Sequence, residues 1–293
     1  MLLRMSTSSP LVGVIVLNYN GRDCLLRSLT SLRQLRYPNF FVVVVDNGSQ
    51  DDSLQLAKEA FPEFSYQENK KNVGFAAGMN VGLHEVFTVR QAAWAWLFNN
   101  DAVADENALT CLIEAAEKEQ DAGLLSPVIS FSGTKELWFG KGRIDSLRMR
   151  ATHEVPTPSE LEQESYPSDF LTGCALLIKK EVFEKVGPLD PCFFLYYEDA
   201  DYSLRSRAAG FRTIVVPGAL VMHEEQSQKN PQKLYHLVLS GLLFFHKHAS
   251  FWQKPYFFLY GTIRRIKNAI DIMRGRDDAL VVRRAYHDFY HGP

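Results

Sequence analysis

The 293-residue sequence contains only four cysteines, and they are far apart. Cys24, Cys111, Cys174 and Cys192 show no paired spacing, which argues against a disulfide framework or a zinc site. Reduced thiols in the cytosol are the simpler interpretation. Residues 1–10 contain no sustained apolar segment, so we expect no signal peptide.

Two nucleotide-binding motifs are also missing. No G-x-G-x-x-G follows the first apolar run and no G-x-x-x-x-G-K-[ST] occurs anywhere, which argues against a dehydrogenase and a P-loop phosphotransferase. The net charge of −2 gives no reason to expect nucleic-acid binding. With 46% hydrophobic and 23% charged residues, the composition is that of a folded globular protein.

Apolar runs alternate with helical patterns in the first hundred residues. We expect strands at 11–17, 40–45, 64–67 and 94–98, and a helix after each of the first three. Asp23 is the predicted cap of the first helix. This alternation predicts an α/β fold, a mostly parallel open sheet with helices on both faces. Polar residues end these strands, where ligands bind in such sheets.

The second half is less regular. We expect strands at 123–129, 176–178 and 211–217, with helices that end near Gly187 and Gly210. Residues 151–169 are rich in Pro, Glu and Ser, which predicts a mobile surface loop.

Three polar positions near predicted strand ends have two interpretations each. In Asn99-Asn100-Asp101, the acid could hold a divalent cation or the segment could cap the next helix. Asp46 could accept a hydrogen bond from a nucleobase or cap its own turn. His223, several residues after a predicted strand, could be structural or a metal ligand.

Glu198-Asp199-Ala200-Asp201 places three carboxylates within four residues. Like charges this close raise at least one pKa, which suits a general base. The alternative is an acidic first helical turn in which Asp201 pairs with Arg205. We expect the Asp201–Arg205 pair to be structural and Asp199 to be the catalytic candidate.

The order of these motifs resembles that of family 2 glycosyltransferases of the GT-A fold, particularly the bacterial rhamnosyltransferase-like branch. Seven stretches over about residues 11–227 carry the resemblance. They are VGVIVLNYNG (12–21), VVVVDNGSQDDS (42–53), NVGFAAGMNVGL (72–83), LFNNDAVAD (97–105), FLTGCALLIKKEVFEKVGPLD (170–190), FFLYYEDADYSLRSRAAGF (193–211) and HEEQS (223–227).

The resemblance implies a role for each candidate. Asp101, in a D-x-D-type segment whose first acids are replaced by asparagines, is expected to hold Mg²⁺ or Mn²⁺ with His223. Asp199 matches the catalytic base, and Glu198 is its acidic neighbour. The other matches are the nucleotide pocket (Tyr19, Asp46, Asn72, Gly74 and Asn100) and the wall near the diphosphate or acceptor (Thr172 and Gly173).

The implied reaction is inverting transfer of a sugar from a nucleotide diphosphate to an acceptor hydroxyl. The branch favours L-rhamnose from dTDP-L-rhamnose, and UDP-sugars are the alternative donors. A sugar-nucleotide pyrophosphorylase would need a Gly-rich basic loop where Asn18-Tyr19-Asn20-Gly21 stands. A non-catalytic nucleotide-sugar-binding scaffold is the other alternative, against which the intact Asp101, Asp199 and His223 argue.

We expect residues 1–230 to form the catalytic domain and residues 231–293 a helical extension. Two apolar, aromatic stretches, 234–245 and 251–263, are too short to span a membrane. From Lys247 onward nine lysines and arginines stand against four aspartates. This pattern suits helices on an anionic membrane surface, or core helices that form a homodimer. By resemblance, we expect a lipid-linked saccharide acceptor at the cytoplasmic face of the cell membrane.

Overall fold

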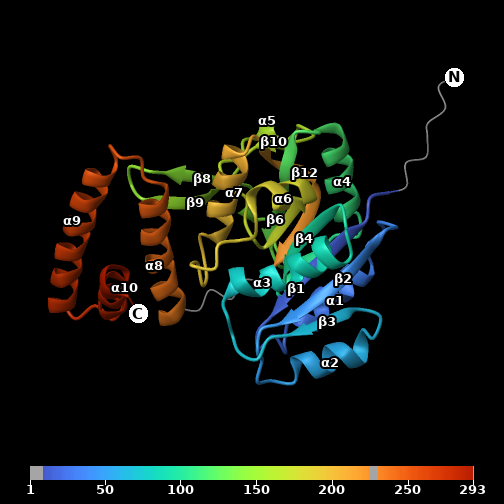
Figure 1. The fold of residues 1–293 in the computed structure, drawn as a ribbon, viewed down its shortest axis with the longest axis horizontal. Coiled ribbons are helices and arrows are strands. Elements are labelled where there is room, and N and C mark those ends of the chain that lie inside the picture. The colour runs from blue at the N-terminus through green and yellow to red at the C-terminus, as the bar shows by residue number, and fades with distance from the viewer. Residues whose placement is uncertain (1–8, 225–229, 293) are drawn as a thin grey trace.

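The computed structural model describes residues 9–224 and 230–292 (Figure 1). In its described part, a ten-stranded sheet has the order β10-β12-β6-β11-β4-β1-β2-β3, with β5 paired to β12 and β7 to β6. Its strands are β1 (Val12–Asn18), β2 (Phe40–Asp46), β3 (Ser65–Glu68), β4 (Trp94–Asn99), β5 (Ala102–Ala104), β6 (Ala122–Phe131), β7 (Leu137–Phe139), β10 (Tyr166–Pro167), β11 (Ala175–Lys179) and β12 (Arg212–His223). A separate hairpin comprises β8 (Lys141–Asp145) and β9 (Arg150–Glu154).

The helices of the first 224 residues follow the predicted alternation. They are α1 (Leu25–Arg33), α2 (Ser53–Ala60), α3 (Phe75–His84) with its π-helical continuation η1 (Glu85–Val89), α4 (Ala108–Lys118), α5 (Pro158–Leu161), α6 (Lys180–Val186) and α7 (Glu198–Ala208). Both faces of β1, β2 and β4 are buried, as continuous apolar runs require. The α/β class with covered sheet faces is therefore confirmed.

The strand register positions the residues of the candidate site. The strands β3, β2, β1 and β4 pair in parallel, as predicted, with Asn18 opposite Asp46 and Leu17 opposite Asn99. On the other side of β4 the sheet is mixed, because β11 runs antiparallel to both β4 and β6. The carboxyl ends of β1, β2 and β4 therefore meet at one edge.

The predicted strand at 211–217 continues through residue 223. β12 is one strand that pairs in parallel with β6, with a register shift between Val216 and Leu220. Pro217 and Gly218 lie in this irregular segment, which explains why the sequence pattern breaks there. The prediction that His223 follows a strand by several residues was wrong, since it is the last residue of β12.

Two local predictions were also wrong. Residues 151–169 are not a structureless loop: they contain part of β9, then α5 and β10, and Thr157 forms a capping box with Glu160. Buried Tyr166 anchors the segment through a hydrogen bond to the Gly140 carbonyl. Asp23 does not cap α1, because Cys24 precedes the helix and makes no side-chain capping bond.

The C-terminal extension consists of three helices at one end of the molecule (Figure 1). They are α8 (Pro231–His248), α9 (Lys254–Met273) and α10 (Ala279–His291). The side nearest the sheet is formed by α8, while α9 is the outermost helix (Figure 1). Within the two described ranges, no helix is long and apolar enough to cross a bilayer.

Candidate active site

Asn18, the last residue of β1, links three strand ends. Its Nδ2 donates to Asp46 Oδ1 at 2.9 Å and to Ser53 Oγ at 2.9 Å, while its Oδ1 accepts from Asn100 Nδ2 at 3.1 Å. Asn18 is fully buried. Sequence reasoning placed Asn18 in a polar turn but missed this role. Its position at the end of a buried strand was the available signal.

Asp46 has both carboxylate oxygens engaged. Oδ1 accepts from Asn18, and Oδ2 accepts from the backbone N–H of Ser49 at 2.9 Å. The predicted turn cap is therefore present, and the side chain is buried. Contact with a nucleobase stays a prediction.

The predicted pocket residues Asn72 and Gly74 are held by Asn47. The Asn47 Nδ2 donates to Asn72 Oδ1 at 3.0 Å and to the Gly74 carbonyl at 3.1 Å. Gly74 has φ +88°, and a Cβ there would lie 2.6 Å from the Phe194 carbonyl oxygen. Glycine is thus required where this loop meets the segment before the acidic cluster. Tyr19, the other predicted contact, is 47% exposed.

Asp101 and His223 come together through a short antiparallel pairing. In the pairing of β5 with β12, Ala102 lies opposite His223, and the Glu224 N–H donates to the Asp101 carbonyl at 2.8 Å. His223 Nε2 then lies 3.0 Å from Asp101 Oδ1. The helix-cap alternative for the Asn99–Asp101 segment was wrong, because β5 intervenes and α4 starts only at Ala108. Residues 225–227 of the HEEQS motif lie outside the described residues.

This pair fits a divalent cation. An octahedral ion with ligand distances of about 2.1 Å places neighbouring ligand atoms about 3.0 Å apart. One imidazole nitrogen and one carboxylate oxygen are suitable donors. His223 Nδ1 is buried without a hydrogen-bond partner in the described part of the chain. No group of three or more His, Cys, Asp and Glu ligands occurs among those residues, so substrate and water would have to complete the coordination.

Asp199, in the first turn of α7, is fixed by two backbone groups. The Gly173 N–H donates to Oδ2 at 2.9 Å and the Ala200 N–H donates to Oδ1 at 2.7 Å. Loss of solvent raises the pKa of Asp199, while these hydrogen bonds and the charge of His153 act in the opposite direction. A half-buried carboxylate with a raised pKa suits the role of a general base.

The Thr172-Gly173 wall connects this carboxylate to the Asn99–Asp101 segment. Gly173 holds Asp199, and the carbonyl of Cys174 accepts from the Asn99 N–H at 2.9 Å. Thr172 is buried, and its Oγ1 accepts from the Cys174 N–H at 3.3 Å. The turn therefore connects the candidate base Asp199 to the Asn99–Asp101 segment through backbone hydrogen bonds.

The two acids that flank Asp199 differ. Glu198 is buried and its Oε2 has no hydrogen-bond partner among the described residues. Burial, followed by the charge of Asp199, raises the pKa of Glu198 well above its ordinary range. Its geometry favours an indirect role, through its effect on Asp199, and its catalytic assignment stays a prediction.

Asp201 is structural, as expected. Its Oδ2 accepts from Arg205 Nε at 2.7 Å. The other oxygen, Oδ1, lies 2.7 Å from Lys247 Nζ and 2.8 Å from His248 Nε2, both on α8. Burial acts to raise the pKa of Asp201, but these partners hold it below its ordinary value. The sequence did not predict Lys247 and His248 as partners, because no local sequence pattern indicates a contact between α8 and Asp201.

The backbone before α7 is strained and supported by α8. Tyr196 and Tyr197 have φ values of +68° and +66°. This left-handed region costs roughly 1–2 kcal/mol for each L residue. Ser240 Oγ donates to the Leu195 carbonyl at 2.8 Å, and Phe244 packs on the Tyr197 ring at a centroid distance of 5.2 Å. The extension therefore fixes the segment that leads into the acidic cluster.

An aromatic cluster borders the cation pair. The Trp138 ring lies 4.4 Å from the His223 ring and 4.6 Å from the His153 ring, between ring centroids. When its ring is protonated, the charge of His153 lowers the pKa of Asp199. Sequence reasoning missed both residues, because it treated residues 151–169 as a loop and assigned nothing to 137–139.

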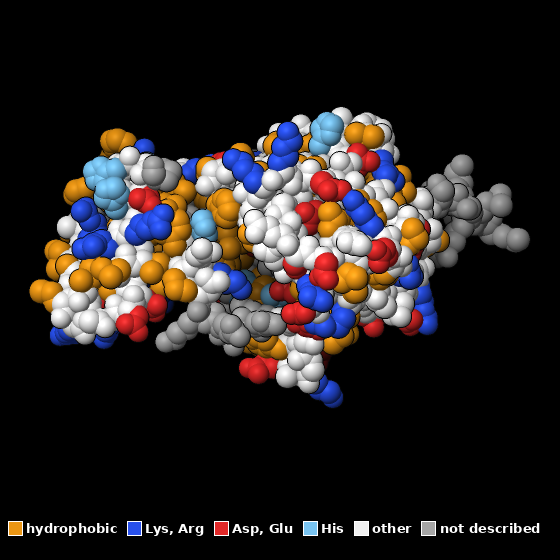
Figure 2. Space-filling model, turned by 90° about the horizontal axis from the view of Figure 1, so that it is seen from below, with side chains coloured by type: hydrophobic (Ala, Val, Ile, Leu, Met, Phe, Trp, Pro, Cys, Tyr) orange, Lys and Arg blue, Asp and Glu red, His pale blue; other side chains and the backbone are white. Residues whose placement is uncertain are grey.

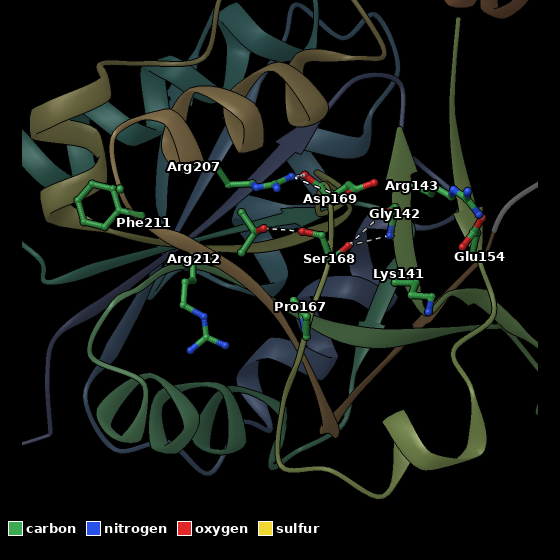
Figure 3. Close-up of a pocket in the computed structure, with 12 residues that line it drawn as sticks. Lys141, Gly142, Arg143, Glu154, Pro167, Ser168, Asp169, Arg207, Phe211 and Arg212 are labelled. Atoms are coloured by element: carbon green, nitrogen blue, oxygen red, sulfur yellow. Dashed lines mark hydrogen bonds and ion pairs between the residues drawn. The ribbon is translucent and has the colours of Figure 1, made fainter. Parts of the chain in front are cut away.

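A separate cavity of about 520 Å³ lies beside β10 and the β8–β9 hairpin (Figure 3). No predicted site residue lines it. Each of its cationic side chains already pairs with a carboxylate: Lys141 with Glu160, Arg143 with Glu154, Arg207 with Asp169 and Arg212 with Glu119. We therefore do not assign the catalytic site to this cavity.

The family model for glycosyl transferase family 2 matches residues 13–187. The match includes the Asn18, Asp46 and Asn100 cluster, Asp101 and the Thr172-Gly173 wall, whereas Asp199 and His223 lie beyond it. The chain belongs to glycosyl transferase family 2. The predicted family resemblance is confirmed.

Two curated relatives of this glycosyltransferase carry assigned activities. It is 25% identical over 266 residues to an N-acetylglucosaminyl-diphospho-decaprenol L-rhamnosyltransferase of Mycobacterium tuberculosis, covering 83% of this chain and 86% of that protein. It is 22% identical over 199 residues to a low-salt glycan biosynthesis hexosyltransferase of Haloferax volcanii, covering 67% and 61%. The first relative supports the predicted rhamnosyltransferase-like branch.

Solved structures confirm the GT-A fold. GalNAc-T7 with UDP, GalNAc and Mn²⁺ superposes with a TM-score of 0.65 at 18% identity, covering 80% of this chain and 48% of that chain. A mannosyltransferase from Pyrobaculum calidifontis in complex with GDP-Man and Mn²⁺ gives 0.60 at 15% identity, covering 97% and 88%. At these identities the likeness concerns the fold alone.

Proposed function

We propose that this glycosyltransferase is an inverting, metal-dependent hexosyltransferase of cell-surface polysaccharide synthesis. The favoured donor is dTDP-L-rhamnose and the acceptor is a hydroxyl of a glycan. The observation that carries the proposal is the half-buried Asp199 carboxylate, held at 2.9 Å by Gly173 on the turn that adjoins the Asn99–Asp101 segment.

The reaction is a single displacement. Asp199 accepts the proton of the acceptor hydroxyl while that oxygen bonds to the anomeric carbon and the bond from this carbon to the diphosphate oxygen breaks. Attack from the face opposite the leaving group inverts the configuration. The nucleoside diphosphate leaves as an anion, so no protein acid is needed for it.

Asp101 and His223 are the residues that would hold Mg²⁺ or Mn²⁺. When bound, such a cation offsets the charge that develops on the departing diphosphate. The strand-end cluster of Asn18, Asp46 and Asn100 lies at the same sheet edge, where it would receive the nucleotide. Mn²⁺ in the two solved neighbours supports a divalent cation.

The acceptor is proposed to be lipid-linked, at the cytoplasmic face of the cell membrane. The mycobacterial relative is an N-acetylglucosaminyl-diphospho-decaprenol L-rhamnosyltransferase, which supports both the acceptor class and the donor. Its identity of 25% leaves UDP-sugars as alternative donors. The extension is proposed to contact the membrane surface or a second copy of the chain.

The test is release of nucleoside diphosphate from a panel of dTDP-, UDP- and GDP-sugars, with and without Mn²⁺ or Mg²⁺. We expect metal-dependent release from dTDP-L-rhamnose and its loss in Asp199→Asn. Release from a UDP-sugar instead would reassign the donor. Nucleotide binding without release from any donor, even when a glycan acceptor is added, would favour the non-catalytic nucleotide-sugar-binding scaffold, and absence of both release and binding would reject the proposal.

A further inference from the structure

One side of α9 carries an exposed apolar stripe. Seven residues spaced alternately by four and three positions are between 38% and 85% exposed. They are Trp252, Tyr256, Leu259, Ile263, Ile266, Ile270 and Met273, the first of them just before the helix. An amphipathic helix normally buries such a stripe, so its exposure indicates a missing partner.

The opposite side of α9 fixes this orientation. Gly261 and Asn268 are the buried residues of the helix. Asn268 Nδ2 donates to the Ala279 carbonyl at the start of α10, at 3.0 Å. Since α9 packs inward through a glycine and an amide, its apolar side is directed outward.

The apolar surface is wider than the stripe. Phe258 is 70% exposed and Phe251 is 76% exposed at the start of α9. The tip of the β8–β9 hairpin adds Leu147, which is 72% exposed and whose carbonyl accepts a hydrogen bond from the Tyr256 hydroxyl. Hydrophobic and basic side chains share this end of the molecule in Figure 2, on its left side.

Basic residues outnumber acids at this surface, where the exposed Asp277 and Asp278 follow the end of α9. Lys254, Arg264, Arg265, Lys267 and Arg274 form no ion pair with a carboxylate in the described parts of the chain. The acid within α9, Asp271, is neutralised by Arg276 at 3.1 Å. The surface therefore combines exposed apolar side chains with uncompensated positive charge.

We propose that α9 and the hairpin tip form a docking face for a lipid bilayer with anionic headgroups. Apolar residues enter the boundary between headgroups and acyl chains while lysines and arginines contact lipid phosphates. Exposed Phe251, Trp252 and Tyr256 suit this boundary, which aromatic side chains favour. This proposal rests on the proposed function in one respect: a lipid-linked acceptor would lie in the membrane to which α9 binds.

A second copy of the chain is a poorer occupant. Two copies joined along the stripe would bring the uncompensated cations of both α9 helices together, with Asp271 already paired. The apolar surface also extends to Phe258 and Leu147, beyond the two positions per seven residues that a coiled-coil seam uses. A broad anionic sheet of lipid matches both features.

The test measures binding of the full-length protein to vesicles without any sugar substrate. We expect co-sedimentation with phosphatidylcholine vesicles that contain phosphatidylglycerol, and much weaker binding to phosphatidylcholine alone. The double variant Ile263→Ser/Ile266→Ser should lose at least tenfold in vesicle affinity. Lys267→Gln/Arg274→Gln should lose affinity for the anionic vesicles only. Val89→Ser, a 58% exposed apolar residue on η1, is the matched control and should bind like the wild type.

Two outcomes overturn the proposal. One is vesicle binding of Ile263→Ser/Ile266→Ser equal to that of the wild type. The other is a wild-type protein that does not bind vesicles and is a dimer, together with an Ile263→Ser/Ile266→Ser variant that is a monomer. That result would make the face an interface between copies of the chain. Equal thermal midpoints verify folding. Release of nucleoside diphosphate with a soluble acceptor should be unchanged in the variant. If the wild type binds vesicles but releases no nucleoside diphosphate, the proposed function is rejected and the docking proposal stands.

Discussion

His223 Nε2 lies 3.0 Å from Asp101 Oδ1, although 122 residues separate them in the chain. The pairing of β5 with the end of β12 creates this contact, and the Glu224 N–H bond to the Asp101 carbonyl fixes it. His223 ends β12 and Asp101 lies in the two-residue turn between β4 and β5, so strand pairing on both sides holds the two side chains in place. A cation held there would need no rearrangement of the protein.

Asp101→Ala is expected to weaken nucleoside diphosphate binding at least tenfold in the presence of Mn²⁺ and to leave metal-free binding nearly unchanged. His223→Ala should behave in the same way, because each variant removes one of two protein ligands. Calorimetric titration with and without Mn²⁺ measures this. The control is Asp23→Ala, an exposed acid before α1. Equal affinity of Asp101→Ala and wild type with metal present would reject the ligand role.

Asp199→Asn should reduce turnover about 10²–10⁴-fold and leave nucleotide affinity within about twofold. The amide keeps the size of the side chain and can still accept the Gly173 hydrogen bond, but it cannot take the acceptor proton. Initial rates of diphosphate release, combined with a binding titration, separate the two effects. Turnover like that of the wild type would exclude Asp199 as the base.

Continuous apolar runs were sufficient to predict β1, β2 and β4, and the rule that ligands bind at strand ends made Asp46 a candidate. The pocket role of Asn100 came from the family resemblance, and both roles stay predictions. An apolar run does not show whether its strand is parallel or antiparallel to its neighbours, so the antiparallel orientation of β11 could not be predicted. Asp199 became the candidate base because three acids in four residues are unusual, and that role stays a prediction. Trp138, His153 and the α8 partners of Asp201 reach the site only through tertiary packing, which leaves no local sequence signal.

Glu198→Gln should stabilise the protein increasingly as the pH rises. The pKa of folded Glu198 is raised, so above its ordinary pKa of about 4.5 the unfolded chain releases the proton while the folded chain retains it. Each pH unit in this window costs the wild type about 1.4 kcal/mol of folding free energy, and glutamine avoids that cost. Urea unfolding at pH 5 and pH 8 measures the difference. A difference between variant and wild type that does not grow with pH would contradict the assignment.

Asp201→Asn should have the opposite sign and cost about 3 kcal/mol at pH 7, because it leaves Arg205, Lys247 and His248 without their shared carboxylate. The pKa of Asp201 is lowered, so its contribution is complete above the ordinary value of 3.8 and is lost as the pH falls through the folded pKa. The difference should therefore shrink in strong acid. Urea unfolding at pH 7 and below pH 3 tests this, with the exposed Glu164→Gln as a control of less than about 0.5 kcal/mol.

His153→Gln should move the acid limb of the kcat/KM profile to higher pH. The charge of protonated His153 lowers the pKa of Asp199, so its removal lets that pKa rise and the base is protonated at a higher pH. The control is His84→Gln, on the exposed side of α3. A midpoint that stays in place or moves to lower pH would show that His153 does not act on Asp199.

The contacts between α8 and the strained Leu195–Tyr197 segment limit how this enzyme can be recombined with its relatives. The sequence suggests a joint at residue 230, but a chain cut there would leave Asp201 buried without Lys247 and His248, and Tyr197 without the Phe244 ring. A chimera that exchanges only α9 and α10, joined in the turn after His248, keeps these contacts. We expect such hybrids to fold and turn over, whereas grafts at residue 230 should destabilise α7, the helix that carries the proposed base Asp199.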